Sequence, residues 1–231
     1  YPSLPLVAEE DAAALRENHA TRDQVVRFVK HILPDATPES VCQWIDRGNA
    51  EPGDQFWVLD PVDGTKGFLR GEQYAVALAC IEDGRVQLGV LACPNLTAAH
   101  RLDPGGPGSL VLAVRGQGTW ATPLGEDAFE PLRVSPLAEP TSAHVLRSVE
   151  SGHTNVGQLD HILAHMCVQG EPVRMDSQAK YAVLAQGSGD LLFRLISAKQ
   201  PNYREKIWDQ AAGSLVVSEA GGTITDLDGR P

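Results

Sequence analysis

Hydrophobic residues recur at helical spacing near the start of the chain and form alternating or continuous strand-like runs in its middle. The predicted helices cover residues 9–18, 21–32 and 37–48. In the third helix, Thr37 is a typical N-cap, Pro38 suits the first helical position and Gly48 marks the stop. The predicted strands cover residues 56–59, 73–82, 85–93 and 110–114. Asp83 and Gly84 lie between two of these strands and predict a hairpin turn.

The second half of the chain has a different pattern, and the change falls at residues 131–140, which contain three prolines. Beyond them, predicted strands cover residues 144–149, 173–175, 191–195 and 223–225, and predicted helices cover residues 156–167, 179–186 and 208–220. Strands that alternate with helices indicate an α/β arrangement, whereas the first half is α+β. We therefore predict an α+β domain over residues 1–135 and an α/β domain over residues 141–231.

Composition narrows the class of protein. The chain has 231 residues, of which 42% are hydrophobic and 21% charged, and it contains no apolar run of the roughly 20 residues that span a bilayer. The net charge of −11 argues against a nucleic-acid partner, and nothing predicts a membrane partner. The four cysteines form no C-x-x-C pair, which predicts buried free thiols in a reducing, cytoplasmic compartment, unless a targeting segment has been removed. An acidic protein that acts on an anionic substrate needs a local basic pocket or bound metal cations.

The run Asp60-Pro-Val-Asp63-Gly-Thr65 follows a predicted strand that ends at Asp60. Pro61 forces a turn, which lets both carboxylates face one site, where they repel one another unless a cation lies between them. Such oxygen ligands suit Mg²⁺ or Mn²⁺, and Gly64 lets the backbone approach an anion closely. The alternative interpretation is an ordinary surface turn with solvated carboxylates.

Two more acidic features have the same dual interpretation. Glu9 lies in a Glu-Glu-Asp run that opens a predicted helix, and Asp209 starts another predicted helix. Acidic residues at such positions are usually caps, although these two can also join the same metal site. A further alternative is a zinc site at His161 and His165, which lacks the glutamate and the third ligand of a zinc protease.

The motifs taken together resemble a known family. Asp60-Pro-Val-Asp63-Gly-Thr65, followed later by Trp208-Asp209-Gln-Ala-Ala-Gly213, is similar to the paired signature of the inositol monophosphatase superfamily. Met175-Asp-Ser-Gln-Ala-Lys-Tyr181 and other runs resemble its 3′(2′),5′-bisphosphate nucleotidases. The resemblance implies a layered αβαβα sugar-phosphatase-like fold and a lithium-sensitive phosphatase with two or three Mg²⁺ ions, which Mn²⁺ can replace. It also implies removal of the 3′-phosphate of 3′-phosphoadenosine 5′-phosphate to give AMP, with the sulfated nucleotide as a further substrate.

The resemblance also implies a role for individual residues. The metal ligands would be Glu9, Asp60, the Val62 carbonyl, Asp63 and Asp209. Thr65 would help activate the attacking water. The substrate contacts would be Gly64, Thr65, His153, Asp176, Ser177, Lys180 and Arg194. Charge supports this assignment, because residues 171–206 carry a net charge of +2 in an acidic chain.

Two other functions stay open, and the ends of the chain differ from the family pattern. An inositol polyphosphate 1-phosphatase is the alternative within the enzymes, and a non-catalytic module that binds metal or nucleotide is the alternative outside them. The family carries an N-terminal helix pair with an acidic catalytic partner, and a last strand and helix, that this sequence does not show. We therefore expect that the chain is truncated at both ends. We also expect a monomer whose substrate is a small nucleotide bisphosphate.

Overall fold

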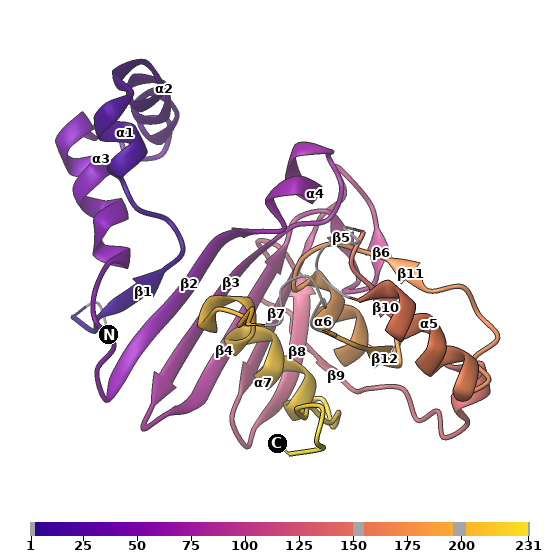
Figure 1. The fold of residues 1–231 in the computed structure, drawn as a ribbon. Coiled ribbons are helices and arrows are strands. Elements are labelled where there is room, and N and C mark those ends of the chain that lie inside the picture. The colour runs from indigo at the N-terminus through magenta and orange to yellow at the C-terminus, as the bar shows by residue number, and fades with distance from the viewer. Residues whose placement is uncertain (1–2, 150–154, 196–201, 231) are drawn as a thin grey trace.

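Most strands of the first half form one mixed seven-stranded sheet (Figure 1). The structure is a computed structural model and describes residues 3–149, 155–195 and 202–230. Across the sheet, the strands are β1 (Leu6–Ala8), β2 (Gln55–Asp63), β3 (Ala75–Glu82), β4 (Arg85–Cys93), β7 (Ser109–Val114), β8 (Gly118–Pro123) and β9 (Glu130–Leu132). β1 and β2 are parallel, and the other neighbours are antiparallel. Beside this sheet lies a small hairpin of β5 (Leu96–Thr97) and β6 (Arg101–Leu102).

The predicted strands of the first half are confirmed, and five strands are found that the sequence pattern did not predict: β1, β5, β6, β8 and β9. Asp83 and Gly84 have φ angles of 49° and 71°, the left-handed values that a two-residue hairpin requires between β3 and β4. β8 and β9 extend the sheet beyond the last predicted strand. β2 is longer than predicted, because it continues through a register shift between Asp60 and Asp63 instead of ending at the first of them.

Three helices form an arm beside the β1 edge of this sheet (Figure 1). They are α1 (Ala13–Glu17), α2 (His19–Val29) and α3 (Pro38–Ile45), which the short 3₁₀ turn η1 (Asp46–Gly48) follows. The predicted cap of α3 is confirmed as a capping box. The Thr37 hydroxyl accepts the Ser40 N–H at 3.1 Å, and the Ser40 hydroxyl accepts the Thr37 N–H at 2.9 Å.

The helix predicted over residues 9–18 is wrong in its bounds, because two polar side chains interrupt it. Asp11 accepts the backbone N–H of Ala13 at 2.7 Å and so stands before α1. Asn18 adopts an extended conformation and accepts the N–H of Thr21 at 3.1 Å, which ends α1 and starts α2.

The second half builds a three-stranded parallel sheet and the helices around it. The strands lie in the order β11 (Val173–Arg174), β10 (Val145–Arg147), β12 (Leu191–Leu192), and the helices are α5 (Val156–His165), α6 (Ala179–Ala185) and α7 (Ala211–Glu219). Leu146 belongs to the core shared with α6 and α7, and its neighbour Val145 belongs to a separate core with α5. The layers are therefore the large sheet, α6 with α7, the small sheet and α5 (Figure 1). The predicted α+β layered fold is confirmed.

Glycine lets α7 approach the large sheet closely. A Cβ at Gly89 of β4 would lie 2.7 Å from the carbonyl oxygen of Ala212 in α7. The largest core therefore runs from the strands of the first half to α6 and α7 of the second half. The division into domains at residues 131–140 stays a prediction.

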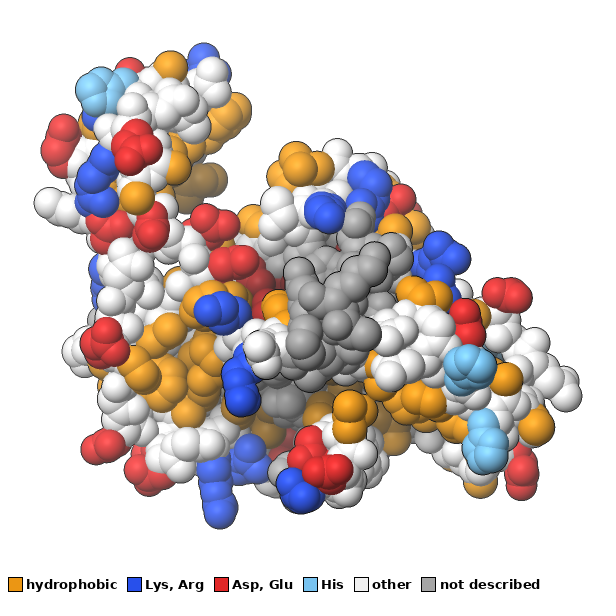
Figure 2. Space-filling model, viewed as in Figure 1, with side chains coloured by type: hydrophobic (Ala, Val, Ile, Leu, Met, Phe, Trp, Pro, Cys, Tyr) orange, Lys and Arg blue, Asp and Glu red, His pale blue; other side chains and the backbone are white. Residues whose placement is uncertain are grey.

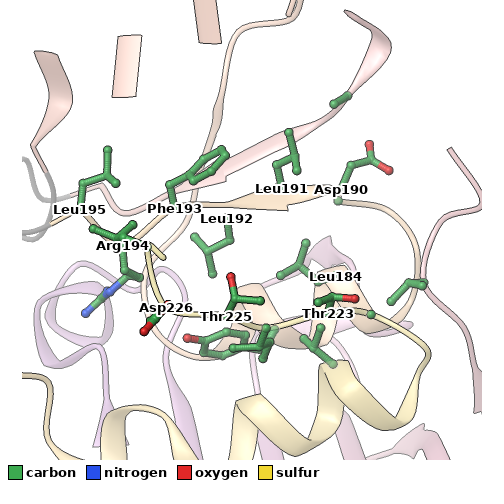
Figure 3. Close-up of a pocket in the computed structure, with 18 of the residues that line it drawn as sticks. Leu184, Asp190, Leu191, Leu192, Phe193, Arg194, Leu195, Thr223, Thr225 and Asp226 are labelled. Atoms are coloured by element: carbon green, nitrogen blue, oxygen red, sulfur yellow. The ribbon is translucent and has the colours of Figure 1, made fainter. Parts of the chain in front are cut away.

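The strand predicted over residues 223–225 is wrong for the structure described. A strand needs a neighbour for its backbone hydrogen bonds, and this run pairs with no strand in the described ranges. It instead lines a large cavity opposite β12 (Figure 3).

Among the described helices, none combines the length and apolar character that crossing a bilayer requires.

The cysteine prediction is confirmed for three of the four residues. Cys42, Cys80 and Cys93 are free and buried, and burial raises the pKa of Cys93 to about 12. Cys167 is exposed, which corrects the prediction. It follows Met166, the C-cap of α5, and has a left-handed φ of 56°, so it lies beyond the helix, where its thiol contacts the His165 carbonyl at 4.0 Å.

Candidate active site

The first part of the site is the irregular end of β2. Asp60 pairs with Ala77 and Asp63 with Ala75, so the register shift leaves Pro61 and Val62 as a bulge between the two carboxylates. Asp60 is 2% exposed and accepts the Val62 N–H at 3.1 Å. The Thr65 hydroxyl donates to the Val62 carbonyl at 3.2 Å at the start of α4 (Thr65–Leu69). The Thr65 hydroxyl therefore keeps lone pairs that can accept a hydrogen bond.

Gly64 is required where this loop meets a second segment. It has a φ of 83°, and a Cβ there would lie 2.8 Å from the Cβ of Ser177. Ser177 itself has a left-handed φ of 64°, a strained value for a residue with a side chain. The close approach brings residues 175–180 against the end of β2.

Gln178 joins the two acidic motifs, a role that the sequence analysis did not assign. Its N–H donates to the Asp63 carboxylate at 2.5 Å. Its side-chain amide donates to the Trp208 carbonyl at 2.9 Å and accepts the Gly213 N–H at 3.0 Å. Asp209 follows Trp208 at the end of η4 (Ile207–Asp209), the 3₁₀ turn before α7. The only sequence signal for this link was the place of Gln178 within the quoted Asp-Ser-Gln-Ala-Lys run.

Lys180 is buried at 3% exposure, and its ammonium group serves the fold. It donates to the carbonyls of Ser177 at 2.7 Å and Met175 at 3.1 Å. Burial lowers its pKa to about 8, although the nearby charge of Asp63 opposes that shift. An ammonium group has three donors, so these two bonds leave one for a ligand.

Asp176 also has a protein partner. Its buried carboxylate pairs with the guanidinium of Arg70, which follows α4. The adjoining backbone is close as well, because a Cβ at Gly67 would lie 3.0 Å from the Asp176 side chain. The pair fastens α4 to residues 175–178.

These elements enclose one cleft of about 240 Å³. It is lined by eleven of the twelve predicted site residues: Glu9, Asp60, Val62, Asp63, Gly64, Thr65, Asp176, Ser177, Lys180, Arg194 and Asp209. The twelfth, His153, lies outside the described residues. On the surface, acidic side chains gather where the helical arm joins the rest of the molecule (Figure 2).

Burial and like charge raise the pKa values of Asp60 and Glu9 in the cleft. The pKa of Asp60 is raised to about 8, first by burial and then by the charges of Asp63 and Glu9. Burial also raises the pKa of Glu9, to which the charges of Glu10 and Asp209 add. Carboxylates that oppose one another's ionisation in this way favour a cation, and their oxygen atoms are the ligands that Mg²⁺ prefers. The donor set therefore fits a magnesium site.

Within the described ranges, no three His, Cys, Asp or Glu side chains converge on a point that could hold a metal ion. The carboxylates line the cleft from three separate segments instead. The same finding removes support from the zinc alternative, since His161 and His165 are exposed on α5 and have no third ligand there.

A larger cavity of about 1330 Å³ (Figure 3) shares lining residues with the cleft. It runs between β12 with the residues after it and the segment around residues 222–227. Tyr181, Leu192, Arg194, Tyr203 and Gln210 line both spaces. Arg194 therefore stands at the boundary between the acidic cleft and the larger cavity.

Known proteins of similar sequence agree on one family. A sequence profile of the inositol monophosphatase family matches residues 5–231. The chain is 39% identical to 3′(2′),5′-bisphosphate nucleotidase 1 of Candida albicans, covering 100% of this chain and 70% of the relative. It is 41% identical to a 3′(2′),5′-bisphosphate nucleotidase of Oryza sativa, covering 98% and 67%.

A solved structure shows a similar fold. It is an inositol monophosphatase from Anabaena, 22% identical, with a TM-score of 0.61 over 84% of this chain and 75% of that one. Enzymes of this family are metal-dependent, typically with Mg²⁺. The profile match over almost the whole chain and the relatives matched over 98–100% of it lead to one conclusion: the chain belongs to the inositol monophosphatase family.

Proposed function

We propose that the protein is a magnesium-dependent 3′(2′),5′-bisphosphate nucleotidase. It hydrolyses the 3′-phosphate of 3′-phosphoadenosine 5′-phosphate, giving AMP and phosphate, and accepts the sulfated nucleotide as a further substrate. The observation that carries the proposal is the cleft itself, in which five carboxylates share one space with Lys180 and Arg194. The carboxylates suit the cations that a phosphate needs, and the two basic residues suit a second phosphate. The named nucleotidases, about 40% identical over nearly the whole chain, support the same substrate.

In this proposal, Glu9, Asp60, Asp63, Asp209 and the Val62 carbonyl hold two or three magnesium ions, which Mn²⁺ can replace. When bound, the ions neutralise phosphate charge and activate a water nucleophile.

The remaining work falls to the chain's own polar groups. The Thr65 hydroxyl donates to the Val62 carbonyl, so its lone pairs can accept a hydrogen bond from the attacking water and orient it for in-line attack. The amides of Gly64 and Thr65 hold the phosphate that is removed. The rest of the nucleotide lies against His153, Ser177, Lys180 and Arg194. Asp176 is assigned to the nucleoside side of the cleft, where Arg70 fixes its carboxylate.

The test is a phosphate-release assay with magnesium, with and without lithium. It compares 3′-phosphoadenosine 5′-phosphate with inositol 1,4-bisphosphate. We expect the nucleotide to be the better substrate and lithium to inhibit its hydrolysis. A clear preference for the inositol bisphosphate would favour an inositol polyphosphate 1-phosphatase instead. Nucleotide binding by calorimetry without hydrolysis would favour a non-catalytic module.

The variant Asp63→Asn tests the assignment of the metal site. It keeps the shape of the side chain and an oxygen that accepts from Gln178, but it removes the charge. We expect phosphate release to be abolished with the fold retained. The matched control is Asp127→Asn, which removes the same charge from an exposed loop. Near-normal turnover by Asp63→Asn would overturn the assignment.

We further propose that the protein is a cytoplasmic monomer. The absence of a membrane-spanning helix in the described residues is compatible with this compartment. Size-exclusion chromatography with light scattering tests the oligomeric state directly.

A further inference from the structure

We infer that Glu205 is a positioning residue that fixes the guanidinium of Arg194 for the second phosphate of the substrate. This inference rests on the proposed function, because it concerns the phosphate that is not removed. Glu205 itself does not line the acidic cleft, whereas Arg194 does. Its effect therefore passes through Arg194.

The contact between the two side chains is a charge-assisted hydrogen bond with two donors. One oxygen of Glu205 accepts from Nε of Arg194 at 3.1 Å and from Nη2 at 2.5 Å. Both side chains are about three-quarters buried, with 26% and 27% exposure. Glu205 lies on the side of the larger cavity, so it holds one edge of the planar guanidinium from that side. The opposite edge of the guanidinium carries Nη1, and this is the edge that a second anion would contact.

The other oxygen of Glu205 is fixed as well. It accepts from the side-chain amide of Gln210 at 3.1 Å, and the amide oxygen of Gln210 accepts from the Tyr181 hydroxyl at 2.5 Å. Tyr181 is buried on α6, and Gln210 is the neighbour of Asp209. The chain of hydrogen bonds thus ties Arg194 to the rigid core and to the turn that carries a proposed metal ligand.

This arrangement matters because Arg194 has a long side chain with many rotamers. A guanidinium that is held before the substrate arrives loses less conformational freedom on binding. Glu205 also brings a negative charge, which by itself repels an anionic substrate. Positioning and charge therefore predict opposite effects of removing Glu205, which makes the inference testable.

Two substitutions separate these effects. Glu205→Ala removes both the contact and the charge, leaving Arg194 and Gln210 without this partner. Glu205→Gln removes the charge and keeps an oxygen for Arg194. Its new amide can donate to Gln210 if that amide reverses, since the Tyr181 hydroxyl can accept as well as donate. Positioning therefore survives in Glu205→Gln.

The experiment measures KM and kcat for 3′-phosphoadenosine 5′-phosphate and for adenosine 3′-phosphate, which lacks the second phosphate. For the bisphosphate, we expect Glu205→Ala to raise KM about tenfold, the usual scale for a lost charge-assisted hydrogen bond. We expect kcat to change little. Glu205→Gln should stay within about threefold of wild type, and neither variant should alter kcat/KM for the monophosphate more than about twofold.

The control is Glu171→Ala, which removes the same side chain from an exposed position of the second half. Equal shifts in KM for Glu205→Ala and Glu205→Gln, or a fall in KM for either one, would show that Glu205 acts only by charge. An equal loss of activity on both substrates would show a merely structural role. Either result overturns the inference.

The inference and the proposed function fail in different ways. If wild-type protein does not hydrolyse the bisphosphate, the proposed function is wrong. If it does and Glu205→Ala keeps the wild-type KM for the bisphosphate, only the inference is wrong. If Glu205→Ala does not fold, Tyr181→Phe is the deciding variant, because it removes the hydrogen bond between the Tyr181 hydroxyl and Gln210 that supports Glu205. A rise in KM for the bisphosphate of about threefold supports the inference, and an unchanged KM overturns it.

Discussion

The packing of α7 against α6 depends on the missing side chain of Gly213. A Cβ at this position would lie 2.1 Å from Cδ2 and 2.6 Å from Cγ of the Tyr181 ring. Carbon atoms in ordinary contact lie about 3.5–4 Å apart, so an alanine overlaps the ring by more than an ångström. The ring has little room to move, because it is buried and its hydroxyl is bonded to Gln210.

We therefore expect Gly213→Ala to destabilise the protein, against the usual effect of alanine in a helix. Overpacking in a core costs about 1–3 kcal/mol, and an overlap of this size belongs at the upper end. The higher helix propensity of alanine returns up to about 1 kcal/mol. The net loss is about 2 kcal/mol, which lowers Tm by about 4–8 °C in a domain of this size.

The measurement is thermal and urea unfolding of the wild type and Gly213→Ala beside the control Gly157→Ala. Gly157 also lies in a helix, but a Cβ there would lie 3.7 Å from the nearest atom, the side-chain oxygen of Asn155, which is an ordinary contact. The control should be neutral or stabilised by up to about 1 kcal/mol. A Tm for Gly213→Ala that equals or exceeds that of Gly157→Ala would refute the close packing of α6 and α7.

Three further predictions follow from contacts elsewhere in the molecule. Glu219→Ala should lower the free energy of unfolding in urea by about 1.5–3 kcal/mol, because the Glu219 carboxylate accepts the N–H groups of Gly116 and Gly118 at 2.9 and 3.0 Å. An unchanged urea midpoint would contradict this prediction. Burial by itself raises the pKa of Asp190, but hydrogen bonds led by the His144 N–H outweigh it and lower that pKa, so this carboxylate stabilises the fold above about pH 4 and the stabilisation is lost as the pH falls further. The difference in urea midpoint between wild type and Asp190→Asn should therefore shrink from pH 7 to pH 3.5, and a constant difference would contradict this. Magnesium at ten times its Kd should stabilise the protein by about 1.4 kcal/mol, measured as a rise in Tm that a chelator of divalent cations reverses. Asp63→Asn should show no such rise.

Much of the local structure could be predicted from the sequence. Thr37 with Pro38 predicted the start of α3, and Asp83 with Gly84 predicted the hairpin, because caps and tight turns depend on a few neighbouring residues. The strand over residues 223–225 could not be predicted correctly in the same way. Its β-branched residues favour an extended backbone, but a strand exists only where a neighbouring strand pairs with it.

The candidate site divides along the same line. The acidic motifs could be recognised from sequence, since the spacing of Asp60 and Asp63 on one loop is local. The partners of the site could not, because Gln178 meets Asp63 across 115 residues of chain and Glu205 meets Arg194 across 11. Nothing in the order of the residues shows which glutamate faces which arginine.

The sequence by itself determined the family, the class of fold and the residue types of the cleft. These depend on short motifs and on the local pattern of hydrophobic and polar residues. The tertiary structure alone decided how those motifs meet. It placed α6 and α7 between two sheets, which brought Gln178 between the two acidic motifs and buried Lys180 against backbone carbonyls. It also gave Glu219 a structural role at the β7–β8 turn. Such contacts depend on the packing of distant elements, and therefore on the whole fold.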